Sequence, residues 1–357
     1  MLVYLQIANQ FLMKYQLLIT GLLIINLSCS AQTSEMPAVE GFGVMFYNLE
    51  NLYDTINDPA KDDEVFLPNA DRQWNASKYD KKLENLSKVI ATGADMLPTL
   101  VGLCEVENEI VVKDLANTTN LKPGNYKYVH YDSPDERGID VALLYNEKLF
   151  KVKSSKAIHV TIPGDTIDYT RDILMVNGEI SIQGKKEQLF VFVNHWPSRS
   201  EGEEQSAPKR AAAAETLKRA VDSINAKFDD ANIIIMGDFN DTPVDISIQR
   251  ILMAKGVSDN YADESLVDLM TNMQAMGLGS YNYKGNWQAL DQIIVSESLL
   301  DGTGLQVNPA STIFVKKDWM LYHNDKYGDS PDRTFAGNKY IGGYSDHLPV
   351  FVGFVVK

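Results

Sequence analysis

The sequence predicts one α/β domain behind a short export segment. Short apolar runs rich in valine, isoleucine and leucine alternate with helical patterns, and glycine, proline and polar turns separate them. Apolar runs of this kind are typical of strands that are buried on both faces. No linker, repeat or low-complexity tract interrupts the chain after residue 41. With 357 residues, of which 45% are hydrophobic and 23% charged, the chain can bury a full core.

The charge balance limits the classes of function. A formal net charge of −15 disfavours a protein that holds polyanions by bulk electrostatics. It does not exclude an enzyme whose cleft is made locally positive by a metal ion.

Residues 1–31 are predicted to be an export signal outside the fold. Lys14 supplies the positive charge, residues 15–27 are almost wholly apolar, and small residues follow. This apolar run is too short for a spanning helix. Two processing sites compete. Lipidation of Cys29 would give an outer-membrane or periplasmic lipoprotein, whereas cleavage after Ala31 would release a secreted protein. Residues 32–40 form a tether, and residues 41–357 form the single domain, which we expect to be a monomer.

Cysteine usage gives a further expectation. The chain has two cysteines, Cys29 and Cys104, so the processed domain is expected to contain no disulfide. Cys104 lies within an apolar strand, which indicates a buried and inert thiol.

Polar groups follow the strands that are predicted in the first half of the chain. The first strand, 41–47, ends in Asn48 and Glu50. A polar loop and an amphipathic helix at 77–92 lead to the strand 97–104, which continues directly into Glu105. A second helix begins after residue 108.

The middle of the chain is rich in predicted strands. They are expected at 126–131, 141–145, 151–162, 173–176, 179–183 and 188–193. Arg171 opens the fourth of them. The last ends at His195, and Pro197 prevents further ladder pairing there.

The stretch after the alanine-rich helix 208–228 is the most informative. Residues 232–236 are an unbroken apolar run, and Gly237 ends it. Asp238 and Asn240 follow two residues apart, and an extended chain directs two such side chains to the same side. An ordinary turn explains this stretch equally well when it is taken alone.

Polar groups also flank the strands near the C-terminus. A helix is predicted at 246–253, an aromatic, turn-rich segment at 281–287, and a strand at 290–295 that begins with Asp291. The segment 319–344 is long, polar and aromatic, and it leads to Asp346 and His347 before the final strand. Loops of this length are usually functional or disordered. It could cover a site, or it could pack as an ordinary surface loop.

Nine polar side chains therefore lie at strand–loop junctions. They are Asn48, Glu50, Glu105, His195, Asp238, Asn240, Asp291, Asp346 and His347. Carboxylates and carboxamides with few histidines suit Mg²⁺, Mn²⁺ or Ca²⁺ better than Zn²⁺. A hard cation beside two histidines indicates attack of water on phosphorus. Taken singly, each of these groups is more often structural, capping or solvated.

These motifs resemble the endonuclease/exonuclease/phosphatase superfamily, which includes pancreatic-type deoxyribonuclease, abasic-site endonucleases, bacterial sphingomyelinases and inositol-phosphate phosphatases. The matching motifs are FYNLEN at 46–51, GLCEVEN at 102–108, TRD at 170–172, VNH at 193–195, GDFN at 237–240, LDQI at 290–293 and SDHLP at 345–349. They occur in the family's order from residue 41 to the C-terminus. The resemblance implies a four-layer sandwich, with two mixed β-sheets packed face to face and helices on the outer faces.

The resemblance also implies a cation site. Glu105 would hold Mg²⁺, or else Mn²⁺ or Ca²⁺, with Asn48, Glu50 and Asp346 nearby. Glu50 stands where some members carry a different acid.

The same resemblance implies catalytic roles. His347, oriented by Asp291, would act as a base or as a charge-stabilising partner for the attacking water. Asp238 would position or deprotonate that water. Asn240 and His195 would bind the non-bridging oxygens of the phosphate, and His195 could protonate the leaving oxygen.

The resemblance is less informative about which phosphate ester is the substrate. Arg171 matches an arginine that contacts phosphate near the scissile bond, where a guanidinium can donate in a fork. Trp196 replaces the small residues of deoxyribonucleases, which weakens the case for a minor-groove reader of DNA. We expect an exported phosphodiesterase that acts on nucleic acid. The alternatives are a hydrolase of phosphate monoesters or phospholipid headgroups, and a non-catalytic surface binding protein.

Overall fold

The computed structural model of the chain describes residues 41–94, 96–164, 169–258 and 265–357. The predicted export signal and tether lie outside the described residues. No helix within these ranges is long and apolar enough to cross a membrane.

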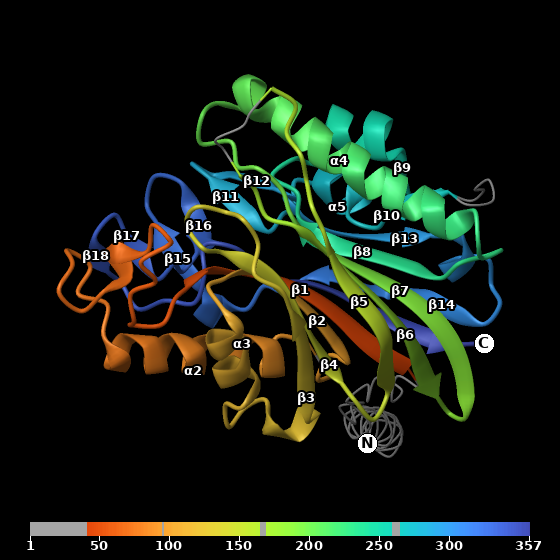
Figure 1. Ribbon diagram of the computed structural model, residues 1–357, viewed down its shortest axis with the longest axis horizontal. Coiled ribbons are helices and arrows are strands. Elements are labelled where there is room, and N and C mark those ends of the chain that lie inside the picture. The colour runs from red at the N-terminus through yellow and green to blue at the C-terminus, as the bar shows by residue number, and fades with distance from the viewer. Residues whose placement is uncertain (1–40, 95, 165–168, 259–264) are drawn as a thin grey trace, which may run out of the picture. The chain divides into compact units, whose positions relative to one another are not determined.

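Two mixed β-sheets form the centre of the domain (Figure 1). The first sheet contains, in spatial order, β14 (Leu305–Phe314), β19 (Val350–Val356), β1 (Gly41–Leu52), β2 (Leu100–Val106), β4 (Asp140–Asn146) and β3 (Tyr126–His130). The second contains β5 (Phe150–Ile158), β6 (Ile173–Ile182), β7 (Lys185–His195), β8 (Ile233–Asp238), β13 (Asp291–Ser296), β10 (Leu266–Asp268) and β9 (Ala254–Gly256). The β1–β2 and β7–β8 pairs at the sheet centres are parallel.

Helices cover the outer face of each sheet, so the predicted four-layer sandwich is confirmed. The helices α2 (Ala76–Thr92) and α3 (Glu109–Ala116) pack with outward-facing side chains of β1 and β2. The helix α4 (Glu203–Asn225) packs on the outer face of β7 and β8. Asn75 caps α2 and Asn108 caps α3, each through a side-chain oxygen that accepts backbone N–H groups.

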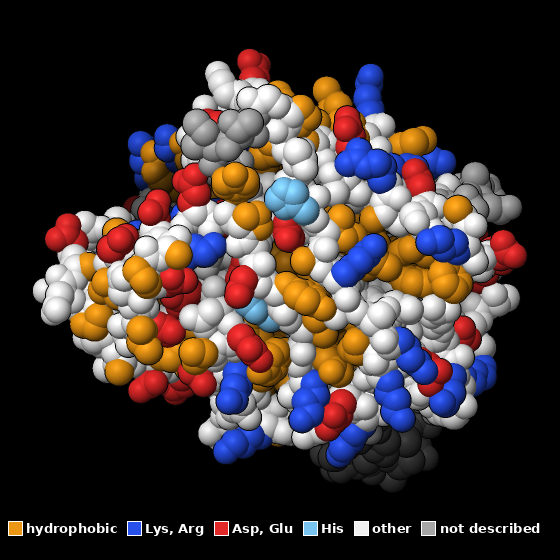
Figure 2. Space-filling model, viewed as in Figure 1, with side chains coloured by type: hydrophobic (Ala, Val, Ile, Leu, Met, Phe, Trp, Pro, Cys, Tyr) orange, Lys and Arg blue, Asp and Glu red, His pale blue; other side chains and the backbone are white. Residues whose placement is uncertain are grey.

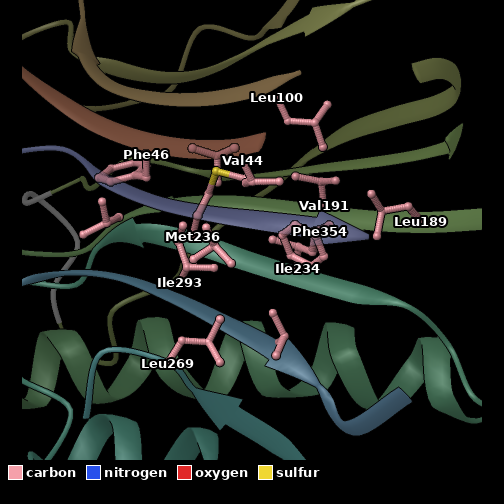
Figure 3. Close-up of a cluster of buried hydrophobic side chains, with 14 of the residues drawn as sticks. Val44, Phe46, Leu100, Leu189, Val191, Ile234, Met236, Leu269, Ile293 and Phe354 are labelled. Carbon is pink, nitrogen blue, oxygen red and sulfur yellow. The ribbon is translucent and has the colours of Figure 1, made fainter. Parts of the chain in front are cut away.

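The inner faces of the two sheets meet in an apolar core (Figure 3). Val44 and Phe46 of β1 face Ile234 and Met236 of β8 across this layer. Their neighbour Met45 points the other way, towards α2. Because these strands are buried on both faces, they appear in the sequence as continuous apolar runs.

Several shorter elements differ from the predictions. The strands predicted at 173–176 and 179–183 are one strand, β6. The helix predicted at 246–253 is a single π-helical segment, η3 (Ser247–Leu252). The segment 281–287 forms a hairpin of β11 (Tyr281–Tyr283) and β12 (Asn286–Gln288), since its alternating aromatic residues suit a pleated strand.

The long segment predicted as a loop at 319–344 is instead built from two small hairpins. They are β15 (Leu321–Asn324) with β16 (Gly328–Pro331), and β17 (Phe335–Ala336) with β18 (Lys339–Tyr340). The remaining short helices are η1 (Glu64–Phe66), η2 (Lys122–Gly124), α5 (Thr271–Ala275), η4 (Glu297–Leu299) and η5 (Asp318–Met320).

Candidate active site

The strand ends meet at one edge of the sandwich, where they line a cavity of about 560 Å³. Six of the predicted site residues line it: Glu105, His195, Asp238, Asn240, Asp346 and His347. The register explains the convergence, because Asp238 at the end of β8 pairs with His195 of β7 on one side and with Asp291 of β13 on the other.

Asn48 joins the two sheets beneath the cavity. Its Nδ2 donates to Asp238 Oδ2 at 3.0 Å and to Glu105 Oε1 at 3.3 Å. The other Glu105 oxygen accepts the backbone N–H of Asn51 at 2.8 Å. Glu105 has φ 60°, a left-handed conformation that is unfavourable for a non-glycine residue and is often found at functional sites. This local turn carries the carboxylate from the end of β2 to the cavity.

His347 and Asp291 form a buried pair. Asp291 is fully buried, and its Oδ2 lies 2.6 Å from His347 Nδ1. The other imidazole nitrogen, Nε2, lies 3.9 Å from Asp238 Oδ2. Burial lowers the pKa of His347, but the charges of Asp291 and Asp238 outweigh it, so this pKa lies well above the ordinary value. These charges therefore favour the protonated form of His347.

His195 has the opposite character. Its Nε2 lies 3.8 Å from both Glu105 Oε1 and Asp238 Oδ2. Burial, followed by the charges of Arg171 and Arg137, holds the pKa of His195 well below the ordinary value, so the ring is neutral. Its Nδ1 is buried and has no hydrogen-bond partner among the described residues.

Asp238 stands between the two histidines. Burial, and then the charge of Asp291, raise the pKa of Asp238 to about 7. His347 and the backbone N–H of Asn240, at 2.9 Å from Oδ1, oppose this rise. A carboxylate with a pKa near the working pH is suited to accept a proton from water.

The donor chemistry at this edge fits a divalent cation. Glu105 and Asp238 share one amide donor, Asn48 Nδ2, so these two carboxylates lie close to each other, and Asp346 lines the same cavity. Their mutual repulsion would be relieved by a hard cation, which prefers oxygen ligands. Glu105 is placed to hold it, and Asp346 and Asn48 stay predicted ligands, since Asn48 directs its Nδ2 to the carboxylates and its Oδ1 accepts the backbone N–H of Glu50.

Glu50 does not line the cavity. Its Oε2 accepts the backbone N–H of Thr334 at 2.6 Å and lies 3.9 Å from the ammonium of Lys82, whose side chain is fully buried. Lys82 Nζ also donates to Thr334 Oγ1 and to the carbonyl oxygens of Glu50 and Tyr344. This arrangement indicates that Glu50 ties the end of β1 to the segment that carries Asp346, and its role as a metal ligand stays a prediction.

Arg171 also lies behind the cavity. Its guanidinium donates to Asp135 Oδ2 at 3.0 Å and to the carbonyl oxygens of His195 and Trp196 at 3.2 and 2.5 Å. These contacts engage all three guanidinium nitrogens, so Arg171 is placed to orient His195. Trp196 is buried against Phe239 and offers no surface to a substrate.

The residues that line the cavity but were not among the predicted site residues are Arg137, Ser198, Arg199, Ser200, Glu203, Tyr281, Tyr283, Gln288 and Leu290. The two tyrosines had a signal, since they alternate within an aromatic hairpin. Arg137 had no such sequence signal. It lies in the connection between β3 and β4, and only the folded structure brings this connection to the cavity.

Comparisons with known proteins identify the family and the fold of the chain. A model described as the Endonuclease/Exonuclease/phosphatase family matches residues 43–356. No curated protein matches the chain. Similar solved structures include a humanized TDP2 of D. rerio (15% identity, TM-score 0.53, covering 88% of this chain and 99% of that chain). An endonuclease/exonuclease/phosphatase family protein of Bacteroides thetaiotaomicron is also similar (17% identity, TM-score 0.53, covering 89% of this chain and 98% of that chain). So is a mannosyl-6-phosphatase of the same organism (18% identity, TM-score 0.51, covering 88% of this chain and 99% of that chain). At these identities the structural similarity shows a shared fold.

Proposed function

The chain belongs to the endonuclease/exonuclease/phosphatase family of metal-dependent phosphoester hydrolases, and we propose that it is an exported phosphodiesterase that acts on nucleic acid. The observation that carries the choice of a diester is the balance of charge in the cavity.

Apart from a bound cation and His347, the cavity offers little positive charge to a substrate. Its lining contains two arginines, Arg137 and Arg199, beside four acidic side chains. The guanidinium of Arg199 is already bound by protein groups. It donates to the carbonyl oxygen of Asn240 at 2.5 Å and forms ion pairs with Asp241 and Asp245 at 3.1 and 3.0 Å. A phosphodiester carries one negative charge, whereas a phosphate monoester carries about 1.5 to 2 at pH 7. The diester is therefore the better match for this cavity.

An aromatic wall supports a substrate with planar groups. Tyr281 lies against His347, with 5.0 Å between ring centroids, and Tyr283 lies two residues further along the same strand. The two side chains share one face and are separated by about 7 Å along β11. Successive bases of a single strand stack on aromatic rings of this kind. The face shown in Figure 2 mixes acidic and basic side chains without a continuous basic tract, so we expect the cavity itself to hold the substrate.

The chain's own residues divide the chemistry among themselves. A divalent cation held by Glu105, Asn48 and Asp346 would polarise a phosphoryl oxygen and offset its charge. Asp238 accepts a proton from the attacking water. His347, held protonated by Asp291, donates a hydrogen bond through Nε2 to a phosphate oxygen. Of the two roles open to His347, its charge supports the stabilising one.

Two neutral donors complete the arrangement. His195, whose carbonyl group Arg171 holds, can donate from Nε2 to a phosphate oxygen or to the leaving oxygen. Asn240 donates one N–H of its side-chain amide to the carbonyl oxygen of Trp196 at 3.0 Å, and its second N–H is placed to bind the phosphate.

A substrate panel tests the proposal. We expect bis(p-nitrophenyl) phosphate and single-stranded DNA or RNA to be cleaved in Mg²⁺, Mn²⁺ or Ca²⁺, and p-nitrophenyl phosphate to be a poorer substrate. His347→Ala should abolish cleavage. The matched control is His130→Ala, because His130 also pairs with an aspartate, Asp140 at 3.0 Å, but does not line the cavity.

Other outcomes would favour the alternatives. Faster turnover of the monoester than of the diester would contradict the charge argument and indicate a phosphomonoesterase. Release of phosphocholine from sphingomyelin without cleavage of DNA or RNA would indicate a phospholipid-headgroup hydrolase. Cation binding without turnover of any ester would indicate a non-catalytic binding protein.

Export is a separate part of the proposal and rests on residues 1–31. Fractionation of cells that express the full chain should place the protein outside the cytoplasm. If Cys29 is lipidated, Cys29→Ala should release the protein from the membrane fraction and abolish labelling with a fatty-acid analogue.

A further inference from the structure

A buried thiol beside two of the cavity residues takes no part in the proposed chemistry. Cys104 is fully buried in β2, immediately before Glu105, and its side chain belongs to the core between the two sheets. The Cys104 sulfur, a His195 nitrogen and an Asp238 carboxylate oxygen all lie within 4.8 Å of one another. Three potential ligands of different chemical type thus meet directly beneath the site.

A second feature is the imidazole of His195, which makes no close side-chain hydrogen bond within the described residues. His195 is 4% exposed, yet its Nδ1 has no hydrogen-bond partner in the described part of the chain. Buried polar atoms are nearly always hydrogen-bonded, so an unpartnered one calls for an explanation. The other nitrogen, Nε2, also makes no close hydrogen bond, because it lies 3.8 Å from Glu105 Oε1 and from Asp238 Oδ2.

The donor set differs from that of the neighbouring oxygen site. A thiolate, an imidazole and a carboxylate are the ligands that Zn²⁺ takes in proteins, whereas Mg²⁺ and Ca²⁺ take oxygen. We propose that Cys104, His195 and Asp238 form a site for a soft divalent cation such as Zn²⁺, and that its occupation inhibits the enzyme.

The geometry requires only a small adjustment. Zinc lies about 2.0 to 2.3 Å from its ligand atoms, so ligands in a tetrahedral site are separated by about 3.3 to 3.8 Å. His195 Nε2 and Asp238 Oδ2 are already 3.8 Å apart. His195 and Asp238 both line the cavity, so an ion would reach them from that side.

Binding includes one proton transfer. The S–H bond of Cys104 breaks, the sulfur electron pair forms the bond to zinc, and the proton leaves to solvent. No oxidant or reductant takes part. Inhibition follows because a bound zinc ion withdraws Asp238 from proton transfer and His195 from the phosphate. This inhibition rests on the proposed function, whereas the binding itself does not.

Spectroscopy with Co²⁺ tests the site without any substrate. Co²⁺ replaces Zn²⁺ in such sites and gives a near-ultraviolet charge-transfer band when a thiolate binds it. We expect this band in the wild-type protein in excess Mg²⁺, its bleaching by added Zn²⁺, and its absence in Cys104→Val. One proton should be released for each Zn²⁺ bound.

Inhibition is measured in parallel, relative to each variant's own rate in Mg²⁺. Cys104→Val should raise the inhibitory Zn²⁺ concentration by at least about 10- to 100-fold. Mutation of an outer-shell partner of a metal ligand already lowers metal affinity by this factor, and loss of a ligand should lower it at least as much. The matched control is His130→Asn, because His130, Asp132 and Asp140 form a separate cluster that could bind Zn²⁺. That variant should keep the wild-type inhibition.

Two results would overturn the proposal. If Cys104→Val and the smaller Cys104→Ala are both inhibited at the wild-type Zn²⁺ concentration, zinc acts by displacing the hard cation at Glu105. If wild-type protein shows no thiolate–Co²⁺ band, Cys104 is not a ligand. Because the band needs no turnover, it remains decisive even if none of the tested esters is a substrate and the proposed function fails.

Discussion

Replacing Asp291 by asparagine isolates the charge that holds His347 protonated. Asp291 is fully buried, with Oδ2 2.6 Å from His347 Nδ1 and with Oδ1 lacking a hydrogen-bond partner within the described ranges. Asparagine has nearly the same volume but no charge. Asp291→Asn therefore leaves His347 buried while it removes the charge that opposes the effect of burial.

The expected size of the effect follows from electrostatics. At about 4 Å and an effective dielectric constant of about 20, a carboxylate favours an imidazolium by about 4 kcal/mol. Removing this charge therefore lowers the pKa of His347, because burial still favours the neutral ring and only the charges of Asp238 and Asp346 remain to oppose it. We expect kcat/KM at pH 7 to fall by about 10²- to 10⁴-fold, the range that positioned acid–base groups contribute.

The assay is the pH dependence of kcat/KM for a phosphodiester, together with an NMR titration of the His347 ring. In the wild type we expect activity to be lost at high pH, where the imidazolium deprotonates, and in Asp291→Asn this loss should occur at lower pH. Asp140→Asn is the control, since Asp140 pairs with His130 at 3.0 Å outside the cavity. A wild-type rate and alkaline limb in Asp291→Asn would refute the assignment of His347 as a cation.

Three further predictions concern binding and stability. Glu105→Gln should weaken Mg²⁺ binding, because one ligand charge is lost, and activity against Mg²⁺ concentration and calorimetry measure this. Lys82→Met should lower the free energy of unfolding in urea by about 3–5 kcal/mol, because it leaves the Glu50 carboxylate buried without its cation; Glu50→Gln in that background should recover part of the loss. Burial raises the pKa of Asp268 to about 7, so the folded state binds the extra proton and stability should fall as the pH rises from about 4 to about 7. Asp268→Asn should remove this pH dependence in thermal or urea unfolding, and an unchanged slope would exclude Asp268 as its source.

Local rules predicted the central strands and the polar groups at their ends, whereas the four-layer arrangement followed from the resemblance to the family. The run 232–236 is apolar throughout and became β8, the central strand whose two faces are both buried. Polar residues that follow such strands are carried to one edge of the sandwich, because β1 and β2, and likewise β7 and β8, run parallel. Asp291 joined them because the antiparallel β13 begins where β8 ends.

The residues that the sequence could not place depend on backbone turns or on non-local partners. The spacing of Asn48 and Glu50 predicts one shared side in an extended chain. However, Glu50 has φ 50° and Asn51 has φ 58°, and this turn directs the Glu50 carboxylate to Thr334 instead of the cavity. Arg171 is engaged by Asp135, which is distant in the sequence, so no spacing rule could distinguish a substrate-binding arginine from a buried one.

The two histidines of the cavity have different charge environments, which the sequence alone could not distinguish. Asp238 Oδ2 lies 3.8 Å from His195 and 3.9 Å from His347, so distance alone does not distinguish them. Their partners do, because Asp291 stands behind His347, whereas the positive charges of Arg171 and Arg137 act on His195. A positive and a neutral donor thus flank the carboxylate that accepts the proton. A cation held at Glu105 would lower the pKa of Asp238 by the same electrostatic rule, so metal binding would also prepare the base for its task at neutral pH.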